Sequence, residues 1–275
     1  MISLSILDYS PIDEGSDAHQ ALWETTELAK HAESLGYKRF WVSEHHMVHS
    51  VAGSSPEMLM MHLAASTSRI RIGSGGVMLP HYSSYKAAEN FRMMEALHPN
   101  RIDMGIGRSP SYRMVNEALN EGKTKRQSYE QQVQDLKKYF TDNTRDEHRF
   151  QSLIAAPAIP TKPEMWMLGT GERGARTAAS QGLGYVFAHF AKPGMSGVKI
   201  VENYRNHFKP SPFLKTPKQS FRYLPLSEKQ KKKPRIWQRH SICGCILWSR
   251  KTSRPIILPS RQPKNGDLRP MKKSK

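Results

Sequence analysis

Six short apolar runs alternate with six amphipathic segments along residues 2–208, and this alternation constrains the fold more than any other feature. The apolar runs lie at residues 2–7, 38–43, 70–80, 101–107, 165–169 and 185–190. Helical spacing marks residues 18–35, 55–68, 82–97, 128–140, 172–180 and 195–208. Successive strand–helix units predict a parallel sheet, because parallel strands need a long crossover connection. A spacing of about 35 residues per unit is that of a (β/α)8 TIM barrel.

A doubly wound open sheet is the alternative arrangement of such units. That fold binds a dinucleotide through a Gly-x-Gly-x-x-Gly turn after its first strand. The first predicted strand instead ends at Ser10-Pro11, without such a turn. The barrel is therefore the favoured fold, and its active site is expected at the C-terminal ends of the strands.

Residues 218–275 break the pattern. They hold 17 of the 42 Lys and Arg residues against two acidic residues, so +15 of the net charge of +18 lies there. Prolines recur and neither periodicity continues. We expect a barrel domain at residues 1–217, incomplete with about six βα units, and an irregular basic tail at residues 218–275. Translation in a changed reading frame would give such an abrupt shift in composition, and a genuine basic extension is the alternative.

The composition of residues 1–217 excludes several classes of protein. That part is nearly neutral, so its charge predicts no specific binding of nucleic acid. The sequence contains no run of about 18 apolar residues, so no membrane span is predicted. The N-terminus lacks the features of a signal peptide. The only cysteines, Cys243 and Cys245, are too close for an ordinary disulfide. The sequence predicts a cytoplasmic protein.

The second apolar run ends in Ser43-Glu44-His45-His46, which places ionisable groups at the expected rim. Histidine titrates near neutral pH, so His45 and His46 suit proton transfer or hydrogen bonding to a cofactor. A pair of solvated loop histidines is the other interpretation. His189, after the sixth run, is expected at the same rim as a structural histidine.

Three stretches rich in glycine offer further contacts. Gly75 and Gly76 interrupt the third run, where glycine marks a bulge, a strained peptide, a flat ligand or simple packing. Arg108 follows the fourth run and offers a planar fork to phosphate or carboxylate, unless it is a solvated loop arginine. The third stretch opens the helix at 172–180 and forms either an anion site or a tight turn. Its residues are Thr170, Gly171, Glu172 and Arg173.

Two other kinds of site are not expected. The sequence has no helical His-x-x-x-His and no set of Asp and His with metal-ligand spacing, so no metal site is predicted. Ser54-Ser55 lies near the histidines, but the Gly-x-Ser-x-Gly elbow of hydrolases is missing.

Taken together, these stretches resemble the bacterial luciferase-like flavin-dependent monooxygenases over residues 1–217, especially single-component members of unassigned substrate. The resemblance rests on the order of residues 41–46, 69–80, 99–103, 105–108 and 168–171. It implies a (β/α)8 barrel that holds reduced FMN at the C-terminal rim and oxidises a small organic substrate with O2.

The resemblance also implies roles for individual residues. Gly75 and Gly76 match the family's non-proline cis peptide under the isoalloxazine ring, and His45 and His46 match a histidine pair near the flavin and its oxygen adduct. Arg108 matches a phosphate-binding arginine. The phosphate loop is matched by Thr170, Gly171, Glu172 and Arg173. Gly107 stands where luciferase has a reactive cysteine, so light emission is not expected.

The leading hypothesis is an FMN-dependent monooxygenase that uses a small substrate and O2, receives reduced FMN from a separate flavin reductase and forms a homodimer. A deazaflavin (F420)-dependent reductase would share the barrel but transfer hydride without oxygen. A truncated, inactive barrel is the third hypothesis, because an unclosed sheet would leave the first and sixth strands without further partners. Nucleic-acid binding by the basic tail is a weaker alternative.

Overall fold

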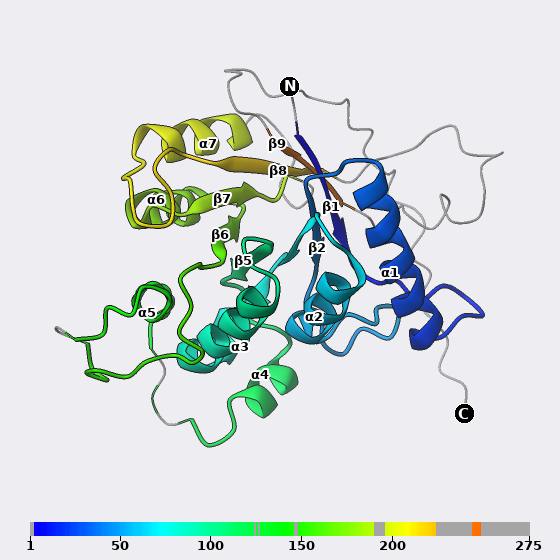
Figure 1. Ribbon diagram of the computed structural model, residues 1–275, viewed down its shortest axis with the longest axis horizontal. Coiled ribbons are helices and arrows are strands. Elements are labelled where there is room, and N and C mark those ends of the chain that lie inside the picture. The colour runs from blue at the N-terminus through cyan, green and yellow to red at the C-terminus, as the bar shows by residue number, and fades with distance from the viewer. Residues whose placement is uncertain are drawn as a thin grey trace.

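The computed structural model describes residues 3–123, 125, 127–145, 148–189, 196–223 and 244–248. Strands and helices alternate along these residues (Figure 1). The strands are β1 (Ser3–Asp8), β2 (Arg39–Val42), β3 (Arg71–Ser74), β4 (Val77–Met78), β5 (Ile102–Gly107), β6 (Glu164–Gly169), β7 (Gly184–Phe187), β8 (Gln219–Tyr223) and β9 (Gly244–Trp248). The helices are α1 (Ala18–Ser34), α2 (Pro56–Ser66), the short 3-10 helix η1 (Leu79–His81), α3 (Ser84–Leu97), α4 (Arg113–Leu119), α5 (Tyr129–Phe140), α6 (Glu172–Gln181) and α7 (Ser196–Asn206).

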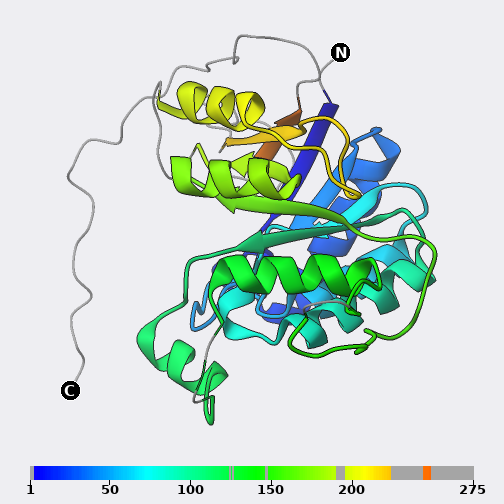
Figure 2. The same ribbon diagram turned by 90° about the vertical axis from the view of Figure 1, so that its left-hand side faces the viewer.

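The strands pair into a ring with the helices around its outside. β1, β2 and β3 are parallel neighbours, β3 and β4 both pair with β5, and β5 to β8 continue in parallel. β9 is antiparallel to both β8 and β1 and lies between them. Figure 2 shows α6 and α7 side by side along β7 and β8. Six βα units precede β8, so the predicted barrel of about six units is confirmed.

The end of the chain differs from the prediction in one respect. We expected the first and sixth strands to lack further partners, and this is wrong, because β1 pairs with β9 and β7 pairs with β8. The high charge of residues 218–275 obscured two short runs of β-forming residues, at 219–223 and 244–248. Residues 224–243 and 249–275 lie outside the described part, and with them most of the expected irregular tail.

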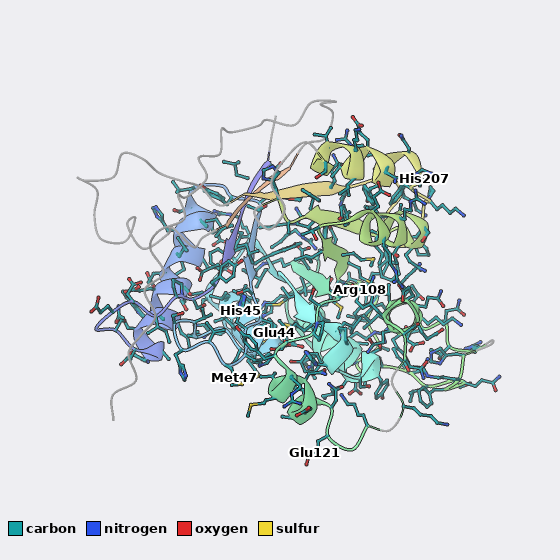
Figure 3. All side chains as sticks on the ribbon, turned by 180° about the vertical axis from the view of Figure 1, so that it is seen from behind. Glu44, His45, Met47, Arg108, Glu121 and His207 are labelled. Carbon is teal, nitrogen blue, oxygen red and sulfur yellow. The ribbon has the colours of Figure 1, made fainter. Side chains whose placement is uncertain are left out.

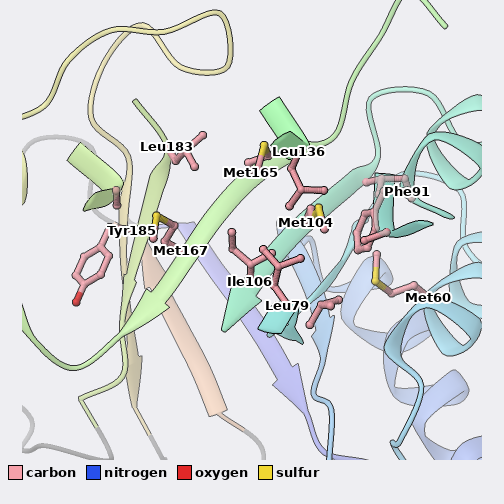
Figure 4. Close-up of a cluster of buried hydrophobic side chains, with 14 of the residues drawn as sticks. Met60, Leu79, Phe91, Met104, Ile106, Leu136, Met165, Met167, Leu183 and Tyr185 are labelled. Atoms are coloured by element: carbon pink, nitrogen blue, oxygen red, sulfur yellow. The ribbon is translucent and has the colours of Figure 1, made fainter. Parts of the chain in front are cut away.

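Most of the hydrophobic core lies between the sheet and the helices. Outward-facing residues of β5 and β6 meet side chains from α2, α3 and α5, as Figure 4 shows. This core includes Met60, Phe91, Met104, Ile106, Leu136, Met165 and Met167. Each such side chain contributes about 1.5–3 kcal/mol when it leaves water, so these contacts hold the helices on the sheet.

A second, smaller core fills the inside of the barrel. Trp41 and Trp166 meet edge to face, with 5.9 Å between their ring centroids. They cluster with Leu7 of β1 and Val186 of β7. Successive side chains of a strand point to opposite faces, and these two point to the inside of the barrel. A Cβ on Gly73 would collide with the Trp41 indole, so glycine makes room for this ring. The interior is therefore packed with side chains and supports the rim above it.

A buried ionic layer lies below the tryptophans, at the N-terminal ends of the strands. The Asp103 carboxylate lies 2.8 Å from Arg39 Nε and 2.6 Å from Arg71 Nη2. It also accepts a hydrogen bond from Trp41 Nε1 at 3.0 Å. Glu164 extends the layer with a contact of 2.7 Å to Arg39 Nη2. Because this end of a barrel is remote from the active-site rim, the layer serves stability.

Side chains cap the N-terminal ends of α1, α3 and α5. Asp17 caps α1 by accepting a hydrogen bond from the Gln20 main-chain N–H at 2.8 Å. Pro56 begins α2, but Ser55 makes no side-chain cap hydrogen bond to the described residues. The short helix α4 was not predicted. None of the helices in the described ranges combines the length and the apolar character needed to cross a membrane.

Candidate active site

The C-terminal ends of β2, β3, β5 and β6 carry the residues predicted for the site. These strands are parallel neighbours, so their C-terminal ends meet at one rim of the barrel. Figure 3 shows Glu44 and His45 on the segment after β2 and Arg108 on the segment after β5. In chain order, β2 is followed by His45 and His46, β3 by Gly75 and Gly76, β5 by Arg108, and β6 by Thr170, Gly171, Glu172 and Arg173.

The peptide bond between Gly75 and Gly76 is cis, as the resemblance implied. It lies directly above the barrel interior, where a Cβ on Gly75 would come within 2.6 Å of Leu7 Cδ1. A Cβ on Gly76 would come within 2.7 Å of the Gly105 carbonyl oxygen. Both positions therefore keep a bare backbone, which is the kind of surface that a flat ring can contact closely.

His45 is held on three sides. Its ring packs against Tyr9 with 4.9 Å between centroids, and its Nδ1 lies 3.0 Å from Ser43 Oγ. Its main-chain N–H donates to the Gly53 carbonyl at 2.9 Å. Burial lowers the pKa of His45, and the nearby Glu44 charge offsets this only in part. Burial thus favours the neutral form of His45, and the Ser43 hydroxyl can donate to its Nδ1 or accept from it.

His46 is tied to Glu44, a residue to which the sequence analysis assigned no role. His46 Nε2 lies 2.8 Å from Glu44 Oε1, which also accepts from the Tyr82 hydroxyl at 2.6 Å. The other oxygen, Oε2, accepts from the Met78 main-chain N–H at 2.7 Å. Burial and the hydrogen bond to Glu44 raise the pKa of the Tyr82 phenol. The one signal in the sequence was the position of Glu44 directly before the two histidines.

Arg173 pairs with Glu130 in the first turn of α5, near Arg108. Arg173 Nη2 lies 2.9 Å from Glu130 Oε1. A main-chain hydrogen bond lowers the pKa of the Glu130 carboxyl, and the charges of Arg173 and Arg108 lower it further. Arg173 thus pairs with the Glu130 carboxylate while the charge of Arg108 also acts on it, and Glu130 is a second residue that the sequence did not indicate.

The start of α6 is open. The helix begins after Gly171, and no side chain of the described residues caps its first turn. A Cβ on Gly171 would meet no described atom within 4 Å. The Glu172 side chain pairs with Arg176 one turn along the helix, at 3.9 Å. The group that Glu172 offers to this opening is therefore its main-chain N–H. Together with the half-buried Thr170, these N–H groups can receive an anion.

A cavity of about 590 Å³ lies between α2 and α3, next to the Tyr82–Glu44 hydrogen bond of this rim. Methionines dominate its apolar wall, and Glu57 and Tyr82 supply polar groups. Burial raises the pKa of the Glu57 carboxyl, and the charge of Glu44 adds to this. Tyr82 lines the cavity, and its hydroxyl also donates a hydrogen bond to Glu44. Within the described ranges, no three His, Cys, Asp or Glu side chains gather closely enough to hold a metal ion.

Comparison with known proteins identifies the family. The model of the luciferase-like monooxygenase family matches residues 3–211. The chain belongs to the luciferase-like monooxygenases. It is 54% identical over 220 residues to the uncharacterized protein YwcH of Bacillus subtilis (strain 168), which covers 79% of this chain and 66% of YwcH. It is 45% identical over 192 residues to N-acetyl-S-alkylcysteine monooxygenase of the same organism, which covers 69% of this chain and 58% of that one. The chain thus spans about two thirds of YwcH and less of the second relative.

Solved structures support the fold of this member of the family. The crystal structure of apo-MsnO8 superposes with a TM-score of 0.72 and 37% identity, covering 79% of this chain and 63% of that one. The FMN complex of the oxygenating constituent of 3,6-diketocamphane monooxygenase from Pseudomonas putida has a TM-score of 0.59 at 18% identity, over 77% of this chain and 65% of that one. An F420-dependent secondary alcohol dehydrogenase has a TM-score of 0.51 at 14% identity, over 74% and 64%. The last two share the fold alone, and the predicted luciferase-like barrel is confirmed.

Proposed function

We propose that this protein is an FMN-dependent monooxygenase that oxidises a small organic substrate with O2. The observation that carries the proposal is the arrangement on one rim of the cis Gly75–Gly76 peptide, the two histidines and Arg173, which pairs with Glu130 near Arg108. Backbone without side chains, proton-carrying groups and an anion site are the three features that a reduced flavin phosphate needs.

The residues at the rim fit FMN. The bare backbone at Gly75 and Gly76 accepts a flat ring, and the open start of α6 with two guanidinium groups suits a doubly charged phosphate. The residues that would hold the cofactor are Gly75, Gly76, Arg108, Thr170, Gly171, Glu172 and Arg173. Bound reduced FMN supplies the activation of O2, while His45 and His46 hold protons beside the reacting groups. A separate flavin reductase is the proposed source of reduced FMN.

An F420-dependent reductase is the second candidate function. The F420-dependent alcohol dehydrogenase with the same fold favours it. Such an enzyme would transfer hydride without O2, so the two candidates differ in their cofactor and in their need for oxygen. The absorbance spectrum of the cofactor that copurifies with the protein, followed by turnover with and without O2, separates them.

Replacing Arg108 by Ala is expected to weaken FMN binding by about 2–4 kcal/mol, because a charge-assisted pair with the phosphate is lost. Riboflavin, which lacks the phosphate, should bind almost as before. Fluorescence titration with both ligands measures this difference. Arg113→Ala is the matched control, since Arg113 is exposed on α4 and pairs with Glu117 at 3.8 Å. Equal losses for FMN and riboflavin would contradict the phosphate assignment.

We also propose that the chain forms a homodimer through the face between α2 and α3. Met58 and Met93 line the cavity there and are 74% and 51% exposed. A single copy of the chain therefore leaves this apolar surface in contact with water. Glu57 on α2 and Lys86 on α3 line opposite sides of the cavity, so two copies related by a twofold axis can pair opposite charges. The double variant Met58→Lys with Met93→Lys is expected to be monomeric in light scattering. A monomeric wild-type protein would refute the dimer.

A further inference from the structure

The Glu44 carboxylate joins three separate parts of the rim. Its side chain is fully buried, with 0% of its surface exposed. Oε1 accepts from His46 Nε2 and from the Tyr82 hydroxyl, and Oε2 accepts from the Met78 main-chain N–H. These donors come from the segment after β2, the start of α3 and strand β4. A buried carboxylate with both oxygens engaged has one stable orientation, so it holds its partners in fixed relation.

The bond to Glu44 determines which nitrogen of His46 carries the proton. An ionised carboxylate only accepts hydrogen bonds, so Nε2 must be the protonated nitrogen of neutral His46. Nδ1 then carries the lone pair. Among the described residues Nδ1 has no hydrogen-bond partner, and 16% of the His46 side-chain surface is exposed. This nitrogen is therefore available to a proton donor at the rim.

The third bond fixes the location of that nitrogen. Met78 follows Gly76 by two residues, so the bond from its N–H to Glu44 ties the carboxylate to the strand that begins just after the cis peptide. His46 is thereby held relative to the bare backbone at Gly75 and Gly76. Its neighbour His45 differs, because the Ser43 hydroxyl can act as donor or acceptor and fixes neither tautomer.

We propose that Glu44 is a positioning residue that keeps the proton of His46 on Nε2 and presents an unprotonated Nδ1 to the rim beside Gly75–Gly76. Glu44 itself touches no substrate. His46 acts there as a proton acceptor of fixed orientation, in the manner of a histidine oriented by a carboxylate at its other nitrogen. The consequence for turnover rests on the proposed FMN-dependent function, whereas the tautomer is a property of the protein alone.

Imidazole 15N spectra of the cofactor-free protein test the tautomer. Wild-type protein is expected to show His46 protonated at Nε2. In Glu44→Gln an amide NH2 can donate to Nε2, so the proton should move to Nδ1. Tyr82→Phe is the matched control, because it removes another donor from the same carboxylate and should leave the His46 tautomer unchanged. An Nδ1-protonated His46 in wild-type protein would overturn the proposal, and this spectrum decides even where a variant fails to fold.

Turnover gives the second readout. Glu44→Gln and His46→Gln are each expected to lower kcat by about 10²-fold, and the double variant should lose little more because the two residues act together. FMN affinity should change much less than kcat. Wild-type turnover in Glu44→Gln together with normal FMN binding would overturn the proposal and leave the proposed function intact. A wild-type protein that binds no FMN would refute the proposed function, and the tautomer would still decide the role of Glu44.

Discussion

Replacing Asp103 by Asn is expected to destabilise the protein by about 3–5 kcal/mol at pH 7. The variant removes the negative charge between Arg39 and Arg71 while both guanidinium groups stay inside the barrel. Arg39 is the more damaging of the two, because only 5% of its side chain is exposed and water cannot replace the lost partner. Breaking a buried pair from one side costs far more than the pair contributes, since it leaves an uncompensated charge.

Glu164→Gln is the matched control for this prediction. Glu164 belongs to the same ionic layer and contacts Arg39, but 28% of its side chain is exposed. Solvent can therefore compensate its loss, and the expected cost is about 1 kcal/mol or less. Urea unfolding of the two variants beside wild type measures the difference. Similar losses for Asp103→Asn and Glu164→Gln would show that burial of the charge is not what makes Asp103 important.

The same residue predicts a pH dependence. Burial alone would raise the pKa of Asp103, but the charges of Arg39 and Arg71 outweigh it and hold the pKa below its ordinary value. A carboxyl with a depressed pKa in the folded state stabilises the protein above its unfolded pKa of about 3.9. That contribution is lost as the pH falls through the folded pKa. Wild-type stability should therefore decline below about pH 4, and Asp103→Asn should show a weaker decline there.

Local periodicity was enough to predict most of the barrel. Up to residue 208, apolar residues recur with a period of two in strands and 3.6 in helices. Each segment shows its own period, so it can be predicted without knowledge of its neighbours. The rim also followed, because any residue directly after a parallel strand lies at the same end of the barrel. His45–His46 were found in this way, from their position after a predicted strand, whereas Gly75–Gly76 were expected inside the third run and were singled out as glycines that interrupt it.

Contacts between distant segments could not be predicted. Tyr82 and Glu44 are 38 residues apart, and nothing near either one indicates that they share a buried hydrogen bond. The ionic layer around Asp103 likewise forms only when the starts of β2, β3, β5 and β6 come together. The pairing of β9 with β1 joins the two ends of the described chain. This pairing is antiparallel, whereas successive βα units predict only parallel strands. Each of these features depends on packing and register rather than on local preference.

We propose that residues 218–275 come from a change of reading frame. The match to the family ends at residue 211, and the charge excess begins within a few residues of that point. The antiparallel β9 then occupies the place between β8 and β1 where an eighth parallel strand would close a (β/α)8 barrel. Translating the coding DNA beyond codon 217 in its other frames tests this, because one of them should encode two further βα units. The absence of such a sequence in either frame would leave a genuine basic extension.

Truncation after residue 217 is expected to abolish cooperative unfolding and to make the protein aggregate. The truncation removes β8 and β9, so β1 and β7 each lose the backbone partners that they have in the ring. A parallel sheet opened in this way exposes two rows of unpaired N–H and C=O groups, which pair readily with other chains. Differential scanning calorimetry and light scattering at matched concentration would report both effects.

Truncation after Trp248 is the matched control, since it also removes a basic segment but keeps β8 and β9. It should unfold cooperatively at nearly the wild-type temperature, which separates loss of the two strands from loss of positive charge. A soluble, cooperatively unfolding protein that ends at residue 217 would show that the first six βα units are stable without ring closure. In that case the antiparallel strand β9 would contribute nothing to the barrel, and the rim with Gly75–Gly76 and His46 would have to be held by those six units alone.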